Sequence, residues 1–389
     1  MNGLGHSISP HQVEEIIKMY YRPTSKLNLS DEQQLSRLLD YAINNQNMQS
    51  SPGFPYNQTH ATTKEMIFYA EDRLRAMVLE RINLLRTDDI TGLTAEEIVQ
   101  GGFADPIKLF VKNEPHRASK ISSGRVRVIF SVSIVDRIVQ MIMCQLQNSW
   151  EIDNWEHIPS KSGFGFTPDK VSRFVKSLSG YPSHQPSDYT ASDVQSWDWN
   201  VTEDDFAFEA YVRWSLEDSN PDDLDFYRNV YYAASRKLVV LSDGRALAQQ
   251  FPGIMPSGAY FTTPSNSRIR VKVGMESGSS PRSMSVMGDD SIEHGVIDLR
   301  NASRNFKGIQ QFEDAVEFCS HLIYFGPGVE PHAEPINVKK MLYKLYSSVN
   351  VEEELFLEKL YGVKQVLQNR SDYSSIVRRI GPLPYSQLF

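Results

Sequence analysis

The sequence has few cysteines, no excess of positive charge and no long apolar run. Its 389 residues include two cysteines, Cys144 and Cys319, which lie far apart in the chain. They give no disulfide framework and no zinc pattern, and we expect both to be core residues in a reducing compartment. The longest apolar stretch, 126–139, is interrupted by charged residues and cannot span a bilayer. The formal net charge of −8 argues against non-specific binding of nucleic acid, for which basic chains are usual.

A turn with two adjacent carboxylates, Gly288-Asp289-Asp290, is the most informative segment that is present. The residues before it, 283–287, predict a short strand, and residues 291–293 predict the start of a return strand. Carboxylates at such a turn suit magnesium, which prefers hard oxygen ligands. A lone Gly-Asp-Asp is also an ordinary surface turn. Its interpretation therefore depends on the segments upstream.

A first upstream segment contains Asp193 and Asp198. Asp193 falls near the end of a predicted strand, and Asp198 stands in a turn before a helix predicted over 206–216. Tryptophans on both sides of Asp198 indicate a partly buried polar site, where a carboxylate needs a partner. We assign Asp193, with Asp289 and Asp290, to divalent cations, and Asp198 to recognition of a ribose.

A second upstream segment is a loop of small residues that leads into a helix. Ser257 lies in the loop, the helix is predicted to be capped at Thr262 or the next residue, and Asn266 lies one turn further on. Together with Asp198, these side chains can bind the 2′-hydroxyl that distinguishes RNA from DNA. A Ser/Thr-rich loop and helix cap is the ordinary alternative, and the order of the three segments favours the ribose site.

A basic segment precedes these three. Lys112 ends a strand-like run, and Arg125 and Arg127 alternate with valines, so we predict that both arginines share one face of a strand. Such a face could hold a triphosphate and stabilise charge on the pyrophosphate leaving group. The alternative is a solvated basic strand. Because the chain is otherwise acidic, the cluster favours the functional interpretation.

In this order, Asp193-x4-Asp198, Ser257-Gly258-x3-Thr262-x3-Asn266 and Gly288-Asp289-Asp290 resemble motifs A, B and C of the RNA-dependent RNA polymerases of positive-strand RNA viruses. The basic segment resembles motif F, and Ser51–Pro55 resembles motif G. Four further segments resemble the sobemovirus group and its sobemo-like relatives: Phe110–His116, Ser131–Asp136, Ser265–Arg270 and Val316–His321.

The resemblance implies an α+β fold, the right-hand polymerase with an antiparallel palm sheet flanked by helices. It implies fingers at 1–187, palm at 188–213, a fingers insertion at 214–250, palm at 251–335 and a reduced, mostly helical thumb at 336–389. It further implies that Asp193, Asp289 and Asp290 bind Mg²⁺, with Mn²⁺ as an alternative. Lys307 is the candidate for the lysine that protonates pyrophosphate, and Phe318–His321 is the candidate primer grip.

The implied partners are an RNA template, a primer or nascent RNA, and nucleoside triphosphates. A genome-linked viral protein and other viral replication proteins are further candidates, and the expected location is the host cytoplasm, with recruitment to membrane-associated replication complexes by partners. A reverse transcriptase is one alternative, although those enzymes exclude the 2′-hydroxyl with a bulky side chain. A catalytically inactive, RNA-binding relative is a second. A metal-dependent phosphohydrolase would need more metal-binding histidines.

Overall fold

The structure is a computed structural model, and it describes residues 8–23, 26–112, 114, 116, 118–124, 126–178, 185–217, 220–295, 297, 304–310, 313–348, 353–368 and 370–380. The chain forms two compact units. The first unit comprises Met1–Asp153 and Ser196–Lys272, and the second comprises Asn154–Gln195 and Val273–Phe389. In the described part of the chain, no helix is both long and apolar enough to cross a membrane.

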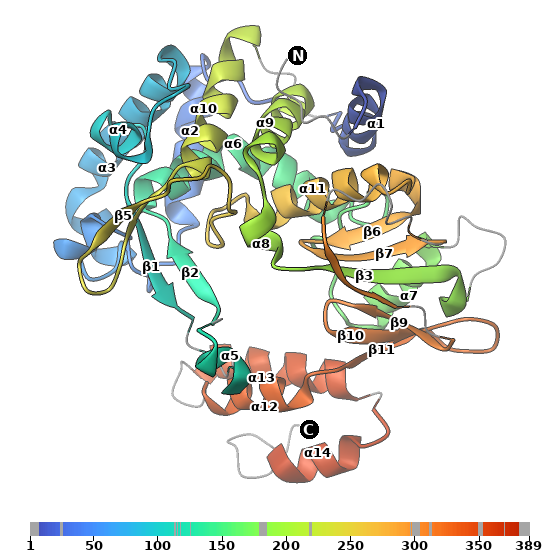
Figure 1. Cartoon of the computed structure of the whole chain (residues 1–389). Helices are drawn as coiled ribbons and strands as arrows, with labels where there is room; N and C mark the ends of the chain where they lie inside the picture. Colours follow the sequence, from blue (N-terminus) through green and yellow to red (C-terminus); the bar gives the residue numbers. More distant parts are fainter. Residues whose placement is uncertain are drawn as a thin grey trace. The chain divides into compact units, whose positions relative to one another are not determined.

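The first unit is mainly helical (Figure 1). Its helices are α1 (Pro10–Tyr20), α2 (Glu32–Asn44), η1 (Tyr56–Gln58), α3 (Thr63–Thr87), α4 (Ala95–Gln100), α5 (Ala118–Ser122), α6 (Ile134–Asp153), α8 (Trp197–Asn200), α9 (Glu203–Glu217), η3 (Pro221–Asp223), α10 (Leu224–Ser235) and α11 (Thr262–Glu276), the last of which continues into the second unit. The helical periodicity of apolar residues over 64–86 and 136–150 predicts two helices, which correspond to α3 and α6. Apolar side chains recur along α6 on its buried side, as the helical period requires.

A small sheet completes the first unit, with strand order β2-β1-β4-β5. Its strands are β1 (Ile107–Val111), β2 (Val128–Ser131), β4 (Leu238–Val240) and β5 (Ala246–Ala248). β1 and β2 pair antiparallel and lie side by side in Figure 1. The prediction that Arg127 lies on a strand is wrong, because β2 begins one residue later, at Val128. Arg125 lies outside the described residues.

The second unit contains an antiparallel sheet with strand order β6-β7-β3-β8. Its strands are β3 (Tyr189–Val194), β6 (Met284–Met287), β7 (Asp290–His294) and β8 (Phe306–Gln310). β6 and β7 form the predicted hairpin, with Met287 paired to Asp290 across the turn. Gly288 has φ +64°, a left-handed conformation that glycine adopts without steric cost, which explains its place in this turn.

The rest of the second unit is a three-stranded sheet and several helices. The sheet contains β9 (Ala315–Phe318), β10 (His321–Tyr324) and β11 (His332–Pro335), and the helical elements are α7 (Pro168–Ser177), η2 (Pro186–Asp188), η4 (Pro281–Ser283), α12 (Val338–Tyr346), α13 (Glu353–Leu367) and α14 (Tyr373–Ile380). Residues of α7, β3, β7 and β9–β11 share one apolar core. Helices α12–α14 form a separate core, which agrees with the predicted helical C-terminal region.

Candidate functional site

Three carboxylates of the second unit, Asp193, Asp289 and Asp290, form what we call the carboxylate cluster. β3 carries Asp193, which pairs with Gly308 of β8 and precedes a shift in strand register. β3 also pairs with β7, the strand that begins at Asp290 (Figure 1). The β6–β7 turn places Asp289 next to Asp290. The sheet therefore brings together two segments that are almost 100 residues apart in the sequence.

The carboxylates of this cluster interact electrostatically. Burial and, after it, the negative charges of Asp289 and Asp193 together raise the pKa of Asp290 to about 6. A hydrogen bond from the Cys319 thiol acts in the opposite direction. Ionisation of Asp290 is therefore opposed by its surroundings, and a nearby cation would favour it.

The donor chemistry of the carboxylate cluster fits a divalent cation, because carboxylate oxygens are the ligands that Mg²⁺ and Mn²⁺ prefer. As the side chains are placed, no three His, Cys, Asp or Glu residues of the described chain are arranged to hold a metal ion. The assignment of Asp193, Asp289 and Asp290 to metal binding therefore stays a prediction.

Cys319, predicted to be a core residue, packs against the apolar core of the second unit but is not fully inside it. It is half-buried, and it stands with Ser320 in the tight turn between β9 and β10, where both residues have positive φ, 49° and 60°. Its Sγ atom lies 3.6 Å from Sδ of Met287. Cys144, by contrast, is fully buried, as predicted. The candidate primer grip at Phe318–His321 is this same turn.

Asp198, Ser257 and Asn266 of the first unit form what we call the ribose cluster. The Asp198 carboxylate accepts a hydrogen bond from Ser257 Oγ and another, 3.1 Å long, from Asn266 Nδ2. The Asp198 carbonyl also accepts from the Met255 backbone N–H at 2.8 Å. The structure thus brings together three side chains that the sequence places 59 and 68 residues apart.

Asn266 has a second hydrogen-bonding atom that matters for a ligand. Its Oδ1 atom is buried and has no hydrogen-bond partner among the described residues. A buried acceptor without a partner is costly unless something else satisfies it. The ribose cluster therefore presents an amide oxygen beside the Asp198 carboxylate, and either group can accept a hydrogen bond from a ligand hydroxyl.

The loop that carries Ser257 is closely packed. Gly258 has φ +145°, and a Cβ atom added there would lie 2.1 Å from the Phe130 carbonyl oxygen. Thr262 Oγ1 donates to the Pro256 carbonyl at 3.0 Å and accepts from the Gly258 backbone N–H at 3.5 Å. Thr262 therefore shapes this loop, and no hydrogen bond between it and Asp198 is found. It is the first residue of α11 and not the cap residue.

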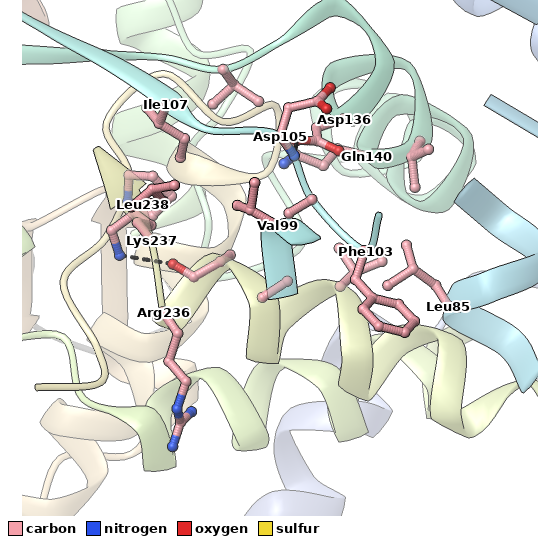
Figure 2. Close-up of a pocket in the computed structure, with 17 residues that line it drawn as sticks. Leu85, Val99, Phe103, Asp105, Ile107, Asp136, Gln140, Arg236, Lys237 and Leu238 are labelled. Atoms are coloured by element: carbon pink, nitrogen blue, oxygen red, sulfur yellow. Dashed lines mark hydrogen bonds between the residues drawn. The ribbon is translucent and has the colours of Figure 1, made fainter. Parts of the chain in front are cut away.

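Pro256, the residue before Ser257, is one of the residues that line a cavity in the first unit (Figure 2). Its volume is about 40 Å³, and none of the predicted site residues lines it. Lys237 lines it and donates from Nζ to the carbonyls of Ala234, Gly253 and Ile254 at 2.7–2.8 Å. Burial lowers the pKa of Lys237 to about 7. The three hydrogen bonds fix the chain that leads into Ser257.

The basic segment contains a partner that sequence reasoning missed. Lys112 Nζ lies 3.6 Å and Arg127 Nη1 3.3 Å from the Glu114 carboxylate. The Glu114 side chain is 4% exposed, whereas Lys112 is 42% and Arg127 62% exposed. Both cations therefore face solvent, and each forms an ion pair with the buried Glu114 carboxylate. The acidic side chain of Glu114, two residues after Lys112, is the feature of the sequence from which this ion pair could have been predicted.

Two further predicted features are the segment 51–55 and Lys307. In the segment 51–55, Gly53 packs so closely on Ser133 that a Cβ atom would lie 2.7 Å from the Ser133 Cα. The Ile134 backbone N–H donates to the Pro52 carbonyl at 2.8 Å. Lys307 lies on β8, but its side chain lies outside the described residues, so its role stays a prediction.

Residues 24–178 and 197–322 match a family described as "Viral RNA-directed RNA-polymerase". The chain is 36% identical over 326 residues to "Protein P1-P2" of Potato leafroll virus, which covers 79% of this chain and 30% of the relative. It is 34% identical to "Replicase polyprotein P2AB" of Southern cowpea mosaic virus, over 71% of this chain and 30% of the relative. The chain thus spans about a third of the length of these two relatives.

A third relative has a length closer to that of this chain. It is the "RNA-directed RNA polymerase" of Mushroom bacilliform virus, 32% identical over 77% of this chain and 74% of the relative. Among solved structures, "Sicinivirus 3Dpol RNA dependent RNA polymerase" has a TM-score of 0.61 over 94% of this chain and 82% of that chain. The sequence identity is 14%, so this similarity concerns the fold alone.

Proposed function

We propose that this chain, which belongs to the viral RNA-directed RNA polymerase family, extends an RNA strand by copying an RNA template. Its fold is the right-hand polymerase fold of the α+β class, and its relatives confirm the resemblance to the sobemovirus group. The division into fingers, palm and thumb stays a prediction. The observation that carries the proposal is the ribose cluster, because it combines a carboxylate, a hydroxyl and an amide that can recognise a 2′-hydroxyl.

The carboxylate cluster would hold two divalent cations, Mg²⁺ or alternatively Mn²⁺. When bound, such cations orient and activate the attacking 3′-hydroxyl and neutralise charge on the leaving pyrophosphate. Asp193 and Asp290 lie on paired strands, so the sheet sets the spacing of their carboxylates. Burial of Asp290 also excludes water from part of the cluster. Rigid strands are a good support for a site that needs accurate positions.

Lys112 and Arg127 would contact the triphosphate, with Arg125 as a further candidate. Both described cations are exposed, and their hydrogen-bond donors can serve phosphate oxygens once they leave Glu114. Because Glu114 holds them in the free protein, an incoming triphosphate competes with one carboxylate for two cations. Lys307 would supply a proton to the pyrophosphate.

The ribose cluster favours this function over a reverse transcriptase, since it offers polar groups to the 2′-hydroxyl where those enzymes place a bulky side chain. An inactive relative is disfavoured because Asp193, Asp289 and Asp290 are all present and adjacent. The proposed partners are an RNA template, a primer or nascent strand, and nucleoside triphosphates. A genome-linked viral protein, other replication proteins and a location in the host cytoplasm at membrane-associated complexes remain predictions.

Primer extension tests the proposal. The wild-type chain is expected to extend an RNA primer on an RNA template with ribonucleotides and Mg²⁺ or Mn²⁺. Asp289→Asn removes one charge from the carboxylate cluster and should reduce extension at least about 1,000-fold. Asp243→Asn is the matched control, because it makes the same change at an exposed turn and should leave extension unchanged. Equal extension by Asp289→Asn would contradict the site.

A further inference from the structure

Helices α9 and α11 are joined by buried polar pairs that lie in register, and we call this set the α9–α11 ladder. Lys272 Nζ donates to Asp205 Oδ1 at 2.9 Å. One turn away on each helix, Arg268 donates to both carboxylate oxygens of Glu209, at 2.9 and 2.8 Å. The same guanidinium pairs with Glu151 of α6. Asp205, Glu209 and Arg213 are four residues apart, so they share one face of α9.

A third set of hydrogen bonds, which involves Tyr231 of α10, completes the ladder. The Tyr231 hydroxyl accepts a hydrogen bond from Arg213 Nε at 2.8 Å and forms another with Ser265 Oγ at 2.8 Å. Arg213 also donates to Asn148 Oδ1 of α6 at 3.0 Å. One hydroxyl group thus joins α9, α10 and α11. Ser265 immediately precedes Asn266, the amide of the ribose cluster.

The ladder is buried throughout, which limits the geometries that it tolerates. Arg268, Glu209 and Ser265 are 0% exposed, and Arg213 and Tyr231 are 1% exposed. A buried ion pair is stable only if its geometry is good and its remaining polar atoms are hydrogen-bonded. A rotation or shift of α11 would break several such bonds at once. The ladder therefore fixes α11, and with it the direction in which Asn266 points.

The ladder is also connected to the segment that carries Asp198. Asp205 Oδ2 accepts hydrogen bonds from both the backbone N–H and the side chain of Thr202, each 2.9 Å long, and so fixes the start of α9. The neighbouring Val201 carbonyl accepts from the Ile254 backbone N–H at 2.8 Å. The same buried network thus holds both the segment that follows Asp198 and the helix α11 that carries Asn266.

We propose that Tyr231 and Ser265 are positioning residues that determine ribose specificity, because they hold Asn266 in place against Asp198. This inference rests on the proposed function, in which the ribose cluster binds the 2′-hydroxyl. Neither residue contacts the substrate. Loss of the shared hydroxyl lets Asn266 move relative to Asp198, so the contact that favours a ribonucleotide weakens. A deoxynucleotide makes no such contact and is affected little.

Tyr231→Phe is the sharpest test, because it removes the hydroxyl and keeps the ring. The ring packs against Phe261 and Phe206, with centroid distances of 4.7 and 6.0 Å. Tyr232→Phe is the matched control on the same helix, since the Tyr232 hydroxyl accepts from the Gly92 backbone N–H at 2.6 Å, outside the ladder. Ser265→Ala removes the other half of the same hydrogen bond and serves if Tyr231→Phe does not fold.

The measurement is kcat/KM for addition of ATP and of dATP opposite one template uridine, with Asn266→Ala as reference. The ATP-to-dATP ratio should fall about fivefold in Tyr231→Phe and Ser265→Ala, the effect of one hydrogen bond. Ser265→Ala removes a bond that Tyr231→Phe already breaks together with the bond to Arg213, so the double variant should show no larger loss than Tyr231→Phe alone. kcat for ATP should stay within about twofold, and Tyr232→Phe should keep the wild-type ratio.

Other outcomes separate the inference from the function on which it rests. Equal losses for ATP and dATP in Tyr231→Phe and Ser265→Ala would show a purely structural role and overturn the inference. An unchanged ratio in both variants, with a lower ratio in Asn266→Ala, would overturn the inference and leave the ribose cluster intact. An unchanged ratio in all three variants would overturn the ribose role of the cluster, and the inference with it.

Discussion

The ribose cluster joins hydrogen-bond donors to an acceptor, whereas the carboxylate cluster joins groups of like charge. Asp198 accepts hydrogen bonds from Ser257 and Asn266, and a buried ladder of ion pairs supports the helix beneath them. Asp290, by contrast, is buried beside Asp289 and Asp193. Its burial and the charges of these two carboxylates all oppose its ionisation. The first cluster is organised by the protein itself. The second opposes folding at neutral pH, and we propose that a bound cation offsets this cost.

The largest effect on stability is expected from Arg268→Met, which breaks the support of the ribose cluster. It leaves Glu151 and Glu209 buried without their shared cation. The free energy of unfolding should fall by about 3–5 kcal/mol, the usual cost of removing one partner of a buried pair. Calorimetry measures the change, and Arg245→Met, at an exposed pair, is the control. A melting temperature equal to that of the control would contradict the ladder's role.

Asn266→Ala breaks the ribose cluster itself. The preference for ATP over dATP should fall about tenfold, because a hydrogen bond to the 2′-hydroxyl beside a charged group is lost. The rate of ATP addition should change much less. Asn200→Ala is the control, since it deletes the same side chain at an exposed position two residues after Asp198. If both variants keep the wild-type preference, Asn266 has no role in ribose selection.

Asp290→Asn sharpens the comparison through pH. The pKa of Asp290 in the folded chain, about 6, lies above that of an ordinary aspartate, so the folded chain holds this proton more tightly than the unfolded chain. This advantage for folding is present below about pH 4 and is lost as the pH rises through about 6. Asparagine does not ionise, so the variant should be more stable than wild type above pH 6.

The gain for Asp290→Asn should be about 1–3 kcal/mol at pH 8 and should disappear towards pH 4. Thermal melts in the presence of a chelator, over pH 4–8, measure it. Asp243→Asn at an exposed turn should show no such dependence. A destabilised Asp290→Asn variant at pH 8 would mean that the charge of Asp290 is favoured in the folded chain.

The smallest effect is expected from Glu114→Gln, which removes the carboxylate that holds Lys112 and Arg127. The KM for nucleoside triphosphates should fall about two- to fivefold, because competition for two partly exposed cations is lost. The difference should shrink as salt concentration rises. Glu156→Gln, at an ion pair with Arg173 in the second unit, is the control. A higher KM would instead make Glu114 a support for the two cations.

Local patterns in the sequence predicted several elements of the fold, including the turn that carries Asp289 and Asp290. The β6–β7 hairpin follows from a short apolar strand and a Gly-Asp turn, and α6 follows from its helical period. The convergence of Asp198, Ser257 and Asn266 came from resemblance to known motifs, since no local pattern encodes contacts across 59 or 68 residues.

Tertiary contacts explain what could not be predicted. Arg268 and Lys272 would ordinarily be placed on a helix surface, yet both are buried, because α9 and α6 supply carboxylates that only the fold reveals. The Glu114 contacts depend on how residues 112 and 127 approach each other. The alternation that placed Arg127 on a strand is wrong for Val126 and Arg127, because β2 begins only at Val128.

The most direct test of the account is the incorporation of ATP against dATP by the wild-type chain, opposite one uridine of an RNA template with Mg²⁺. The ribose cluster predicts that ATP is preferred by more than about 100-fold, because the buried Asn266 oxygen and the Asp198 carboxylate stay without a ligand hydroxyl when dATP binds. Equal incorporation of the two nucleotides would contradict the central claim that this site selects ribonucleotides.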